Sequence, residues 1–321
     1  GYLTTIAEKE TPATGTYAYN VAGENVELYY IYAYCHDQQY IGSGEWRYTN
    51  DPSKNVLPAA DEINYYVLSD SFAAFCHDMK TLADAGCWSR SAINNTVPLH
   101  DAFANGTSAA LAWNNTVISY MSQCETNVDG AATAVYTLLD DDDVVFSYSY
   151  NGDGLAIAAG SQYPERAAMV IDLLKFDTTL NNLTRLGIEG EHYINNGDGT
   201  YSDGPENAKY PDGGTSLSWA SANGALTQAY SDPKQVALQA WWDAHLVMCP
   251  GANFTFDSSS VKAELAAVDA IRQEYWAGLT LGLMDDVDGT LAEMRTKMEA
   301  AGVQKVIDAY RTQYTAWAEG K

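Results

Sequence analysis

Apolar residues recur every three to four positions in several stretches of the chain, and this spacing is typical of amphipathic helices. One such stretch covers about 71–86, where Phe72 and Met79 fall on the same face. Asp70 or Ser71 comes just before the apolar positions, and both residue types commonly cap helix N-termini. We therefore expect a helix here with one side buried.

The final third of the chain carries further helical patterns. We expect helices at about 233–246 and 258–283, and two more that Gly302 separates, because glycine commonly follows a helix C-terminus. Thr290 and Glu293 have the spacing of a capping box, in which each side chain binds the other residue's backbone N–H. The first of these two helices is therefore expected to begin at Thr290.

Two stretches predict β-structure. Residues 26–34 form a run of β-branched, aromatic and other apolar residues with few charges, which favours a buried strand. Residues 195–204 contain Asn-Gly and Asp-Gly pairs, a strong signal for a hairpin turn. The segment 195–203 and the acidic run 140–143 are rich in oxygen ligands, so a cation site is an alternative in both places. The acidic run lacks the spacing of an EF-hand loop, which favours a solvated loop there, and the turn residues favour the hairpin at 195–204.

Residues 151–174 have a distinctive order: a Gly-rich turn, a short apolar strand at 155–159, a second turn and a helix that Pro164 opens. Proline is tolerated in a first helical turn because its missing N–H would have no partner there. Glu165 favours the positive end of the helix dipole. The helix carries one apolar stripe, made up of Ala167, Val170, Ile171 and Leu174.

This last stretch resembles a segment of bacterial extracellular solute-binding proteins, the capture subunits of ABC importers. Residues 103–110 resemble a second motif of that family, with Thr107 at a position where lysine is frequent. Residues 187–193 are similar to the Gly-Ile-Glu-Gly-Lys-His-Tyr stretch of one lipoprotein-type branch, with Glu191 in place of the lysine.

The C-terminal part of the chain is similar to the closing region of the same branch, which has a characteristic domain of unknown function. The stretches that carry this similarity are 251–265 and 298–317. Because several motifs occur in the family's order, the resemblance extends from about Phe72 to the C-terminus. It is weak before Phe72.

The resemblance implies an α/β fold of the periplasmic-binding-protein-like type II class. We expect residues 1–185 to form mainly the second lobe, a mixed sheet flanked by helices. Residues 186–321 are expected to form a mostly helical region that packs on the lobes. Full-length members of the family begin with a signal peptide, a lipidated cysteine in Gram-positive species and a first lobe. That beginning is not visible here, so we expect a chain shortened at its N-terminus.

The charge and the aromatic content of the chain limit the classes of molecule that it is expected to bind. The chain has 17 Lys and Arg against 42 Asp and Glu, a formal net charge of −25, which disfavours nucleic acids and anionic lipid surfaces. It also has 23 Tyr and 8 Trp, whose flat faces and polar tips suit sugar rings, although many of the tyrosines would also suit strands. A neutral or cationic small ligand fits this composition best.

Catalytic and cofactor signatures are missing from the sequence. It has no Walker or Rossmann fingerprint, no nucleophile elbow, no HExxH pair, and no CxxC among its 5 cysteines. No cofactor and no metal are therefore predicted. Asp243 and Glu191 are candidate acids for glycoside hydrolysis, but their surroundings in the sequence favour a structural interpretation for both.

In solute-binding proteins the loops at strand ends line the ligand cleft, and the resemblance carries this expectation onto the corresponding loops here. Trp219 is the strongest single candidate for stacking, because it lies in a Gly/Ser-rich loop with no helical or strand period. For every candidate, packing inside the protein is the alternative interpretation. The candidate ligand-binding residues are Trp113, Asn114, Tyr148, Tyr150, Asn151, Asp153, Trp219 and Asn223.

The resemblance therefore implies a solute-binding subunit of an ABC importer, which captures an oligosaccharide or a related neutral solute and catalyses nothing. Its expected partners are the ligand and the membrane permease subunits, and it is expected to be a monomer. The full-length protein would be extracellular and lipid-anchored at the cell surface, or periplasmic. Two alternatives stay open: a secreted glycan-degrading enzyme of the glycoside hydrolase type, and a surface interaction protein without a small ligand.

Overall fold

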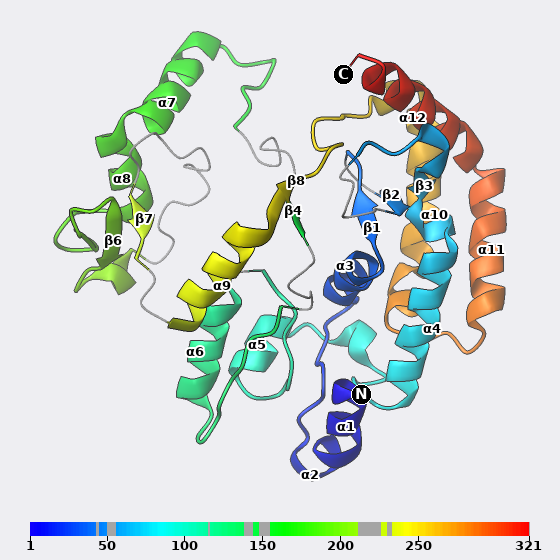
Figure 1. Cartoon of the computed structure of the whole chain (residues 1–321), viewed down its shortest axis with the longest axis horizontal. Helices are drawn as coiled ribbons and strands as arrows, with labels where there is room; N and C mark the ends of the chain where they lie inside the picture. Colours follow the sequence, from blue (N-terminus) through cyan, green and yellow to red (C-terminus); the bar gives the residue numbers. More distant parts are fainter. Residues whose placement is uncertain are drawn as a thin grey trace. The chain divides into compact units, whose positions relative to one another are not determined.

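The structure is a computed structural model of residues 1–321. It describes residues 1–42, 45–49, 56–114, 116–137, 144–147, 155–210, 226–229 and 233–320. The chain divides into two compact units, a larger one of Gly1–Ser147 with Ala237–Lys321 and a smaller one of Tyr148–Val236 (Figure 1). These two units do not test the lobe boundary expected at residue 185, which stays a prediction.

The larger unit is mostly helical. Its α-helices are α1 (Tyr2–Lys9), α2 (Thr11–Thr14), α3 (Val26–Cys35), α4 (Asp70–Asp84), α5 (Leu99–Ala104), α6 (Val117–Asn127), α9 (Pro233–His245, counted here from Ala237), α10 (Lys262–Thr280), α11 (Val287–Ala300) and α12 (Val303–Ala318). Its short 3₁₀ helices are η1 (Ala60–Glu62), η2 (Tyr66–Leu68), η3 (Ala92–Asn94) and η6 (Ser258–Val261).

Two small sheets accompany these helices. Strands β1 (Gln38–Tyr40), β2 (Trp46–Thr49) and β3 (Asn64–Tyr65) form an antiparallel sheet in that order, with Tyr40 opposite Arg47 and Trp46 opposite Tyr65. Strands β4 (Val145–Ser147) and β8 (Leu246–Met248) pair in parallel, although they are far apart in the sequence. The described part of the chain thus combines helices with short strands.

Aromatic side chains dominate the core of the larger unit. Tyr29 on α3 and Phe72 on α4 both pack against Trp276 on α10, with ring centroids 4.8 and 6.1 Å from the indole. All three side chains are almost fully buried. Such pairs add about 0.5–1.5 kcal/mol each beyond the burial of apolar area. These contacts hold α3, α4 and α10 together.

The C-terminal helices are fastened to the N-terminal half by buried tyrosines. The hydroxyl of Tyr310 on α12 donates to the backbone oxygen of Ile41 over 2.6 Å, and that of Tyr314 donates to Pro58 over 2.8 Å. The ring of Tyr310 also stacks on Trp46, with centroids 3.8 Å apart. Figure 1 shows α12 beside α10 in this part of the unit.

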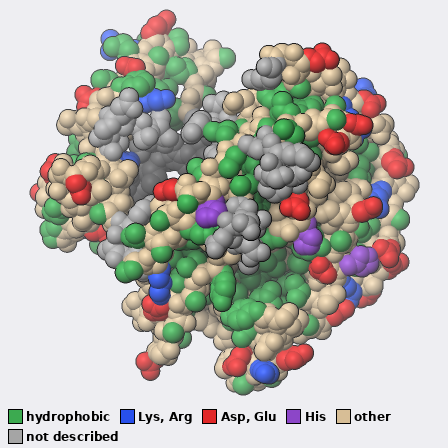
Figure 2. Space-filling model, in the orientation of Figure 1, with side chains coloured by type: hydrophobic (Ala, Val, Ile, Leu, Met, Phe, Trp, Pro, Cys, Tyr) green, Lys and Arg blue, Asp and Glu red, His purple; other side chains and the backbone are tan. Residues whose placement is uncertain are grey.

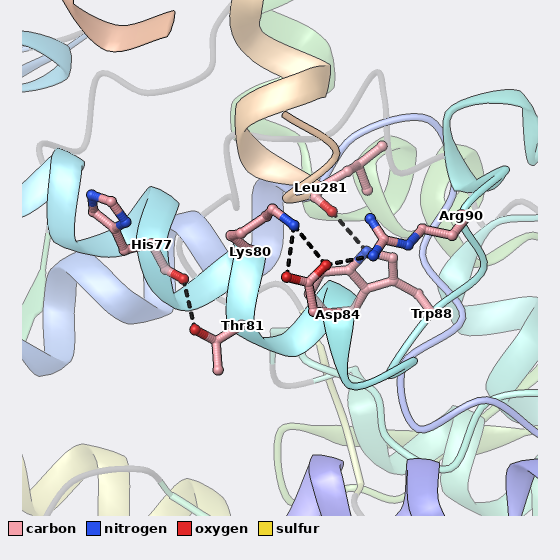
Figure 3. A network of polar contacts seen from close by, with 7 residues as sticks. All are labelled: His77, Lys80, Thr81, Asp84, Trp88, Arg90 and Leu281. Atoms are coloured by element: carbon pink, nitrogen blue, oxygen red, sulfur yellow. Dashed lines mark hydrogen bonds and ion pairs between the residues drawn. The ribbon is translucent and has the colours of Figure 1, made fainter. Parts of the chain in front are cut away.

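A polar network joins the end of α4 to the end of α10, and Figure 3 shows it from close by. The Asp84 carboxylate lies between the Lys80 ammonium group, 2.6 Å away, and the Arg90 guanidinium. Beneath these ions the buried Trp88 indole N–H donates to the backbone oxygen of Leu281 over 2.9 Å. Because the ion pairs are exposed and the indole bond is buried, the indole bond contributes more to stability.

The smaller unit contains α7 (Pro164–Phe176), α8 (Thr178–Leu186), η4 (Asn207–Lys209) and strands β5 (Tyr193–Asn195), β6 (Thr200–Asp203) and β7 (Thr227–Gln228). Strand β6 pairs antiparallel with β5 and parallel with β7. Leu186, Tyr193 and Leu226 form its small core. The hairpin predicted at 195–204 is confirmed, and its turn glycines Gly197 and Gly199 both have positive φ.

Several predicted helices are confirmed, including α4, α7, α9, α10 and α12. The start of α4 is capped one residue earlier than expected, since the Ser69 hydroxyl accepts from the Phe72 N–H over 3.1 Å. The expected start at Thr290 is wrong: α11 begins at Val287, and the carboxylate of Asp286 caps it by accepting from Gly289. Both Thr290 and Asp286 are residue types that cap helices, and the structure uses Asp286, which starts the helix one turn earlier.

The strand predicted at 26–34 is wrong, because these residues form α3. The run is apolar nearly all round, so neither a two-residue nor a 3.6-residue period is visible in it. Helix and buried strand then differ only in what the residues pack against. Here Phe75 on α4 and Trp276 on α10 pack against Tyr29 in its helical conformation. Such tertiary contacts override the weak strand preference of aromatic residues.

The start of the smaller unit also differs from expectation. Residues 155–158 are not in a strand, so the short strand predicted there is wrong within the described residues. The helix opened by Pro164 is present as α7, but none of its residues is fully buried. Val170 of the predicted stripe is 55% exposed. An apolar stripe predicts helical conformation well and predicts burial only when a partner covers it.

The surface is acidic, as the composition requires. Figure 2 shows more acidic than basic side chains over the face in view. Within the described ranges, no helix combines the length and the apolar character needed to cross a membrane.

Candidate ligand-binding site

The described residues include two of the predicted site residues, Trp113 and Asn114. Both lie in the segment that connects α5 to α6. The other candidates lie outside the described residues: Tyr148, Tyr150, Asn151, Asp153, Trp219 and Asn223. The candidate site is therefore built from the larger unit, starting at Trp113.

Trp113 belongs to an aromatic cluster that reaches the surface. Its indole lies 5.2 Å from the imidazole of His100 and 6.5 Å from the ring of Tyr120, measured between ring centroids. The rings of His100 and Tyr120 are 4.8 Å apart, so each ring contacts both others. Trp113 is 37% exposed, while the other two rings are half-buried. We call these three residues the Trp113 shelf.

Each ring of the shelf comes from a different element. His100 lies in the first turn of α5, Tyr120 is the fourth residue of α6, and Trp113 lies in the segment between these helices. Helices α5 and α6 also pack against each other. The shelf is therefore held by the packing of two helices and does not depend on one loop alone.

A tight turn after α5 sends the chain back toward the shelf. Gly106 has φ of +73°, a conformation that residues with a side chain rarely adopt. A Cβ atom at this position would also lie 2.8 Å from the side chain of Val128. After the turn, Thr107 donates its N–H to the backbone oxygen of Ala102 over 2.8 Å. Both the positive φ and the close approach of Val128 explain why the family-like motif at 103–110 has glycine at position 106.

Hydrogen bonds to the N-terminal segment then fix the path to Trp113. Ala109 donates its N–H to the backbone oxygen of Tyr17 over 2.9 Å. The Ser108 hydroxyl accepts from the Asn20 N–H over 2.9 Å and donates to the backbone oxygen of Ala110 over 2.8 Å. Ser108 is almost fully buried, so these bonds form away from water and hold the segment firmly.

Asn114 has a local role in the structure. Its side-chain oxygen accepts from the N–H of Thr116 over 2.9 Å and from the Thr116 hydroxyl over 2.7 Å. This Asx turn directs the chain into α6, which begins at Val117. The side-chain oxygen is therefore engaged in the turn, although Asn114 as a whole is exposed.

Sequence reasoning missed two further groups in this part of the unit, Glu27 and Tyr19. Glu27, in the first turn of α3, is near enough to His100 for the imidazole charge to lower the pKa of its carboxyl. The larger effect is burial, which raises that pKa above its usual value, and Glu24 raises it further. Tyr19 is 1% exposed, and its pKa is raised well above its usual value, first by burial and then by Glu27, while a hydrogen bond with the backbone of Ala112 acts in the opposite direction.

The charges around the shelf are mainly negative. Asp101 lies 3.7 Å from His100 and adds a second carboxylate to that of Glu27. The arrangement offers flat apolar faces together with hydrogen-bond acceptors, which is suited to a sugar ring and poorly suited to an anion. Among the described residues, no group of three or more His, Cys, Asp or Glu side chains has the geometry of a metal site.

Asp243 and Glu191, the two candidate acids for glycoside hydrolysis, lie in hydrogen-bonded helix and turn structure. Asp243 accepts from Gln239 over 2.8 Å within α9. The backbone oxygen of Glu191 accepts from the Glu206 N–H, and the neighbouring His192 accepts from the Ile188 N–H over 2.9 Å through Nδ1. These contacts shape turns and helices, as the sequence interpretation favours.

The fold is that of ABC-transporter solute-binding proteins, because solved structures of that class match nearly the whole chain. The N-glycan transport solute-binding protein NgtS of Streptococcus pneumoniae matches with a TM-score of 0.65 and 12% identity, over 99% of this chain and 67% of its own. An HMO-binding solute-binding protein of Bifidobacterium longum infantis matches with a TM-score of 0.53 and 11% identity, over 98% and 69%.

FusA of S. pneumoniae, an ABC-transporter substrate-binding protein in complex with kestose, matches with a TM-score of 0.51 and 11% identity, over 99% of this chain and 67% of its own. The family model of DUF3502, a domain of unknown function, matches residues 250–319. No curated protein matches the sequence. The expected periplasmic-binding-protein-like α/β fold and the C-terminal domain of unknown function are therefore confirmed.

Proposed function

We propose that this protein is the oligosaccharide-binding subunit of an ABC importer. The observation that carries the proposal is the Trp113 shelf, an exposed aromatic cluster with carboxylates beside it, on a fold shared with solute-binding proteins. Structures of NgtS contain Man1GlcNAc and Man5GlcNAc, and that of FusA contains kestose. These ligands belong to those proteins, and they suggest which sugars to test here.

The chemistry of the shelf supports a sugar more than other small solutes. The C–H face of a pyranose ring is apolar and packs on an indole, while its hydroxyls need hydrogen-bond partners at the ring edge. Trp113 offers the flat face, and Asn114 and His100 are the polar residues next to it. Tyr148, Tyr150, Asn151, Asp153, Trp219 and Asn223 remain candidates for the rest of the site.

The same proposal includes the protein's surroundings. Its partners are the permease subunits of the importer, which receive the loaded protein, and it acts as a monomer outside the cell membrane. The full-length protein is held there by a lipid anchor or is retained in the periplasm. The protein releases its solute unchanged, so it is not an enzyme.

Calorimetric titration tests the proposal. The probes are the disaccharide of mannose on N-acetylglucosamine, kestose and, as unrelated ligands, an amino acid mixture and a tripeptide. We expect saturable binding of at least one sugar, with Kd between about 1 µM and 1 mM, and none of the unrelated ligands. Binding of the tripeptide alone, or release of reducing ends from either sugar, would overturn the proposal.

A further inference from the structure

We propose that His192 closes the turn between α8 and β5 as a pH-sensitive latch: its neutral imidazole holds the turn, and its protonated imidazole releases it. The latch is the hydrogen bond between Ile188 and His192. It belongs to the smaller unit, whereas the Trp113 shelf belongs to the larger one, so this proposal and the sugar proposal can fail independently.

The latch joins the two ends of the turn. The Ile188 N–H donates to Nδ1 of His192 over 2.9 Å. In the other direction, the His192 N–H donates to the backbone oxygen of Ile188 over 2.8 Å. A backbone N–H group can only donate, so Nδ1 must present a lone pair to it. The imidazole that fits this turn is therefore the neutral form with its proton on Nε2.

A glycine makes room for the ring. Gly187 is buried and has φ of +84°, a conformation that residues with a side chain rarely adopt. A Cβ atom at this position would lie 2.4 Å from Nδ1 of His192. Any other residue here would displace the imidazole from the Ile188 N–H. The glycine and the histidine of the family-like motif at 187–193 are thus parts of one arrangement.

The imidazole also contacts the segment that follows β6. It stacks on the ring of Tyr210, with centroids 5.3 Å apart, and the Tyr210 hydroxyl donates to the backbone oxygen of Thr184 over 2.7 Å. The backbone oxygen of His192 accepts from the Gly204 N–H over 2.9 Å and from the Asn207 amide over 3.2 Å. His192 therefore connects α8, the turn and the segment 204–210.

Protonation breaks the latch because it removes the acceptor. Histidine is the side chain that ordinarily changes its charge between pH 5 and pH 8. Once Nδ1 has taken up a proton, it is a donor and points an N–H group at the N–H group of Ile188. The stabilisation of the turn by this bond is therefore present while His192 is neutral, and it is lost as the pH falls and the ring is protonated.

The charged groups around the turn lie mostly in water. Glu189 and Glu191 in the turn itself are exposed. In the segment that packs on the ring, Glu206 and Lys209 form an ion pair with each other. The other titratable groups of the neighbouring elements are Arg185, Tyr193, Asp203 and Tyr210. Water and salt weaken the effect of the four exposed charges on the imidazole, so the geometry of the latch sets the response of the turn.

Nuclear magnetic resonance of the full chain at pH 8 and pH 5 tests the proposal through two readouts. The chemical shifts of the His192 ring nitrogens should show the proton on Nε2 alone at pH 8 and on both nitrogens at pH 5. Hydrogen exchange of the Ile188 amide, expressed as protection relative to the unfolded chain, should be the second readout. We expect this protection to be at least about 5-fold lower at pH 5 than at pH 8.

Two variants serve as matched comparisons. In His192→Asn the side-chain oxygen can accept from the Ile188 N–H but takes up no proton, so the protection should be equal at both pH values. His245→Asn, which replaces a histidine of α9, should behave like the unaltered chain.

A proton on Nδ1 at pH 8 would overturn the proposal, and so would equal protection of the Ile188 amide at the two pH values. An equal loss of protection in the unaltered chain and in His192→Asn would mean that another group causes it, and this result would overturn the proposal as well. All these measurements are made without a sugar, so a failed sugar titration leaves their outcome unchanged.

Discussion

The indole of Trp113 and the imidazole of His100 lie 5.2 Å apart between ring centroids, although they come from different elements. The turn at Gly106 lies between them and reverses the chain after α5. The contact fixes the indole while leaving 37% of Trp113 exposed. An exposed aromatic ring that is already held in place loses little conformational freedom when a ligand binds, which favours binding.

The first prediction concerns this ring. Trp113→Ala should weaken sugar binding at least about 10-fold, because stacking on an aromatic face is lost, and Trp113→Phe should recover part of it. Calorimetric titration with the mannose disaccharide and kestose measures both. Trp113→Ala also removes the ring contacts with His100 and Tyr120, so melting curves of both variants are needed to show that they are folded at the titration temperature. Full binding by Trp113→Ala would contradict the role of the shelf.

The second prediction concerns the pH dependence that Glu27 causes. Burial raises the pKa of its carboxyl. The resulting stabilisation is complete below the unfolded pKa of about 4.3 and is lost as pH rises through the higher folded pKa. At pH 7 the ionised Glu27 is therefore a net cost. Glu27→Gln should melt about 1–2 °C higher than the unaltered chain at pH 7, and this difference should shrink at pH 4.

The control for this measurement is Glu8→Gln, which replaces an exposed acid. Its melting temperature should differ from that of the unaltered chain by the same small amount at both pH values. A lower melting temperature of Glu27→Gln at pH 7 would mean that the carboxylate stabilises the fold, contrary to the direction of its pKa.

The third prediction concerns the joint between α4 and α10. Trp88→Phe removes the buried N–H that donates to Leu281 and leaves that carbonyl oxygen without its partner. We expect a loss of about 2–4 kcal/mol in the free energy of unfolding, from the lost hydrogen bond and the smaller ring together. Urea unfolding measures it. Arg90→Gln, at the exposed ion pair in the same network, should cost less than about 1 kcal/mol.

The fourth prediction concerns the cysteines. Burial raises the pKa of Cys76 to about 12, and it also raises the pKa values of Cys87, Cys124 and Cys249. Cys35 is exposed. A thiol reagent at pH 8 should therefore label Cys35 within minutes and the other four only after unfolding, because the thiolate is the reactive form. Rapid labelling of Cys76 in the folded protein would show that its site is open to water.

The sequence predicts best those elements whose signals are local and repeated. The α12 stripe of Val303, Val306 and Tyr310 is buried as its helical spacing indicates. The Asn-Gly and Asp-Gly pairs at 196–199 form their hairpin because the turn needs positive φ, which glycine adopts without strain. In these cases the same residues set both the backbone and the packing.

Prediction from the sequence fails where residues far away in the chain determine the conformation of a segment. The apolar run of α3 is compatible with a strand or a helix until Phe75 and Trp276 pack against Tyr29. The site shows the same limit. The family-like motif before it singles out Trp113, but no spacing in the sequence brings His100 and Tyr120 beside the indole. Those contacts arise from the packing of α5 against α6.

The account depends on a sugar lying against Trp113, and a crystal structure of the chain soaked with the mannose disaccharide tests this most directly. We expect density for one pyranose ring parallel to the indole, with its carbon atoms within about 4 Å of the ring. A sugar bound elsewhere, with the face of Trp113 bare, would contradict the account.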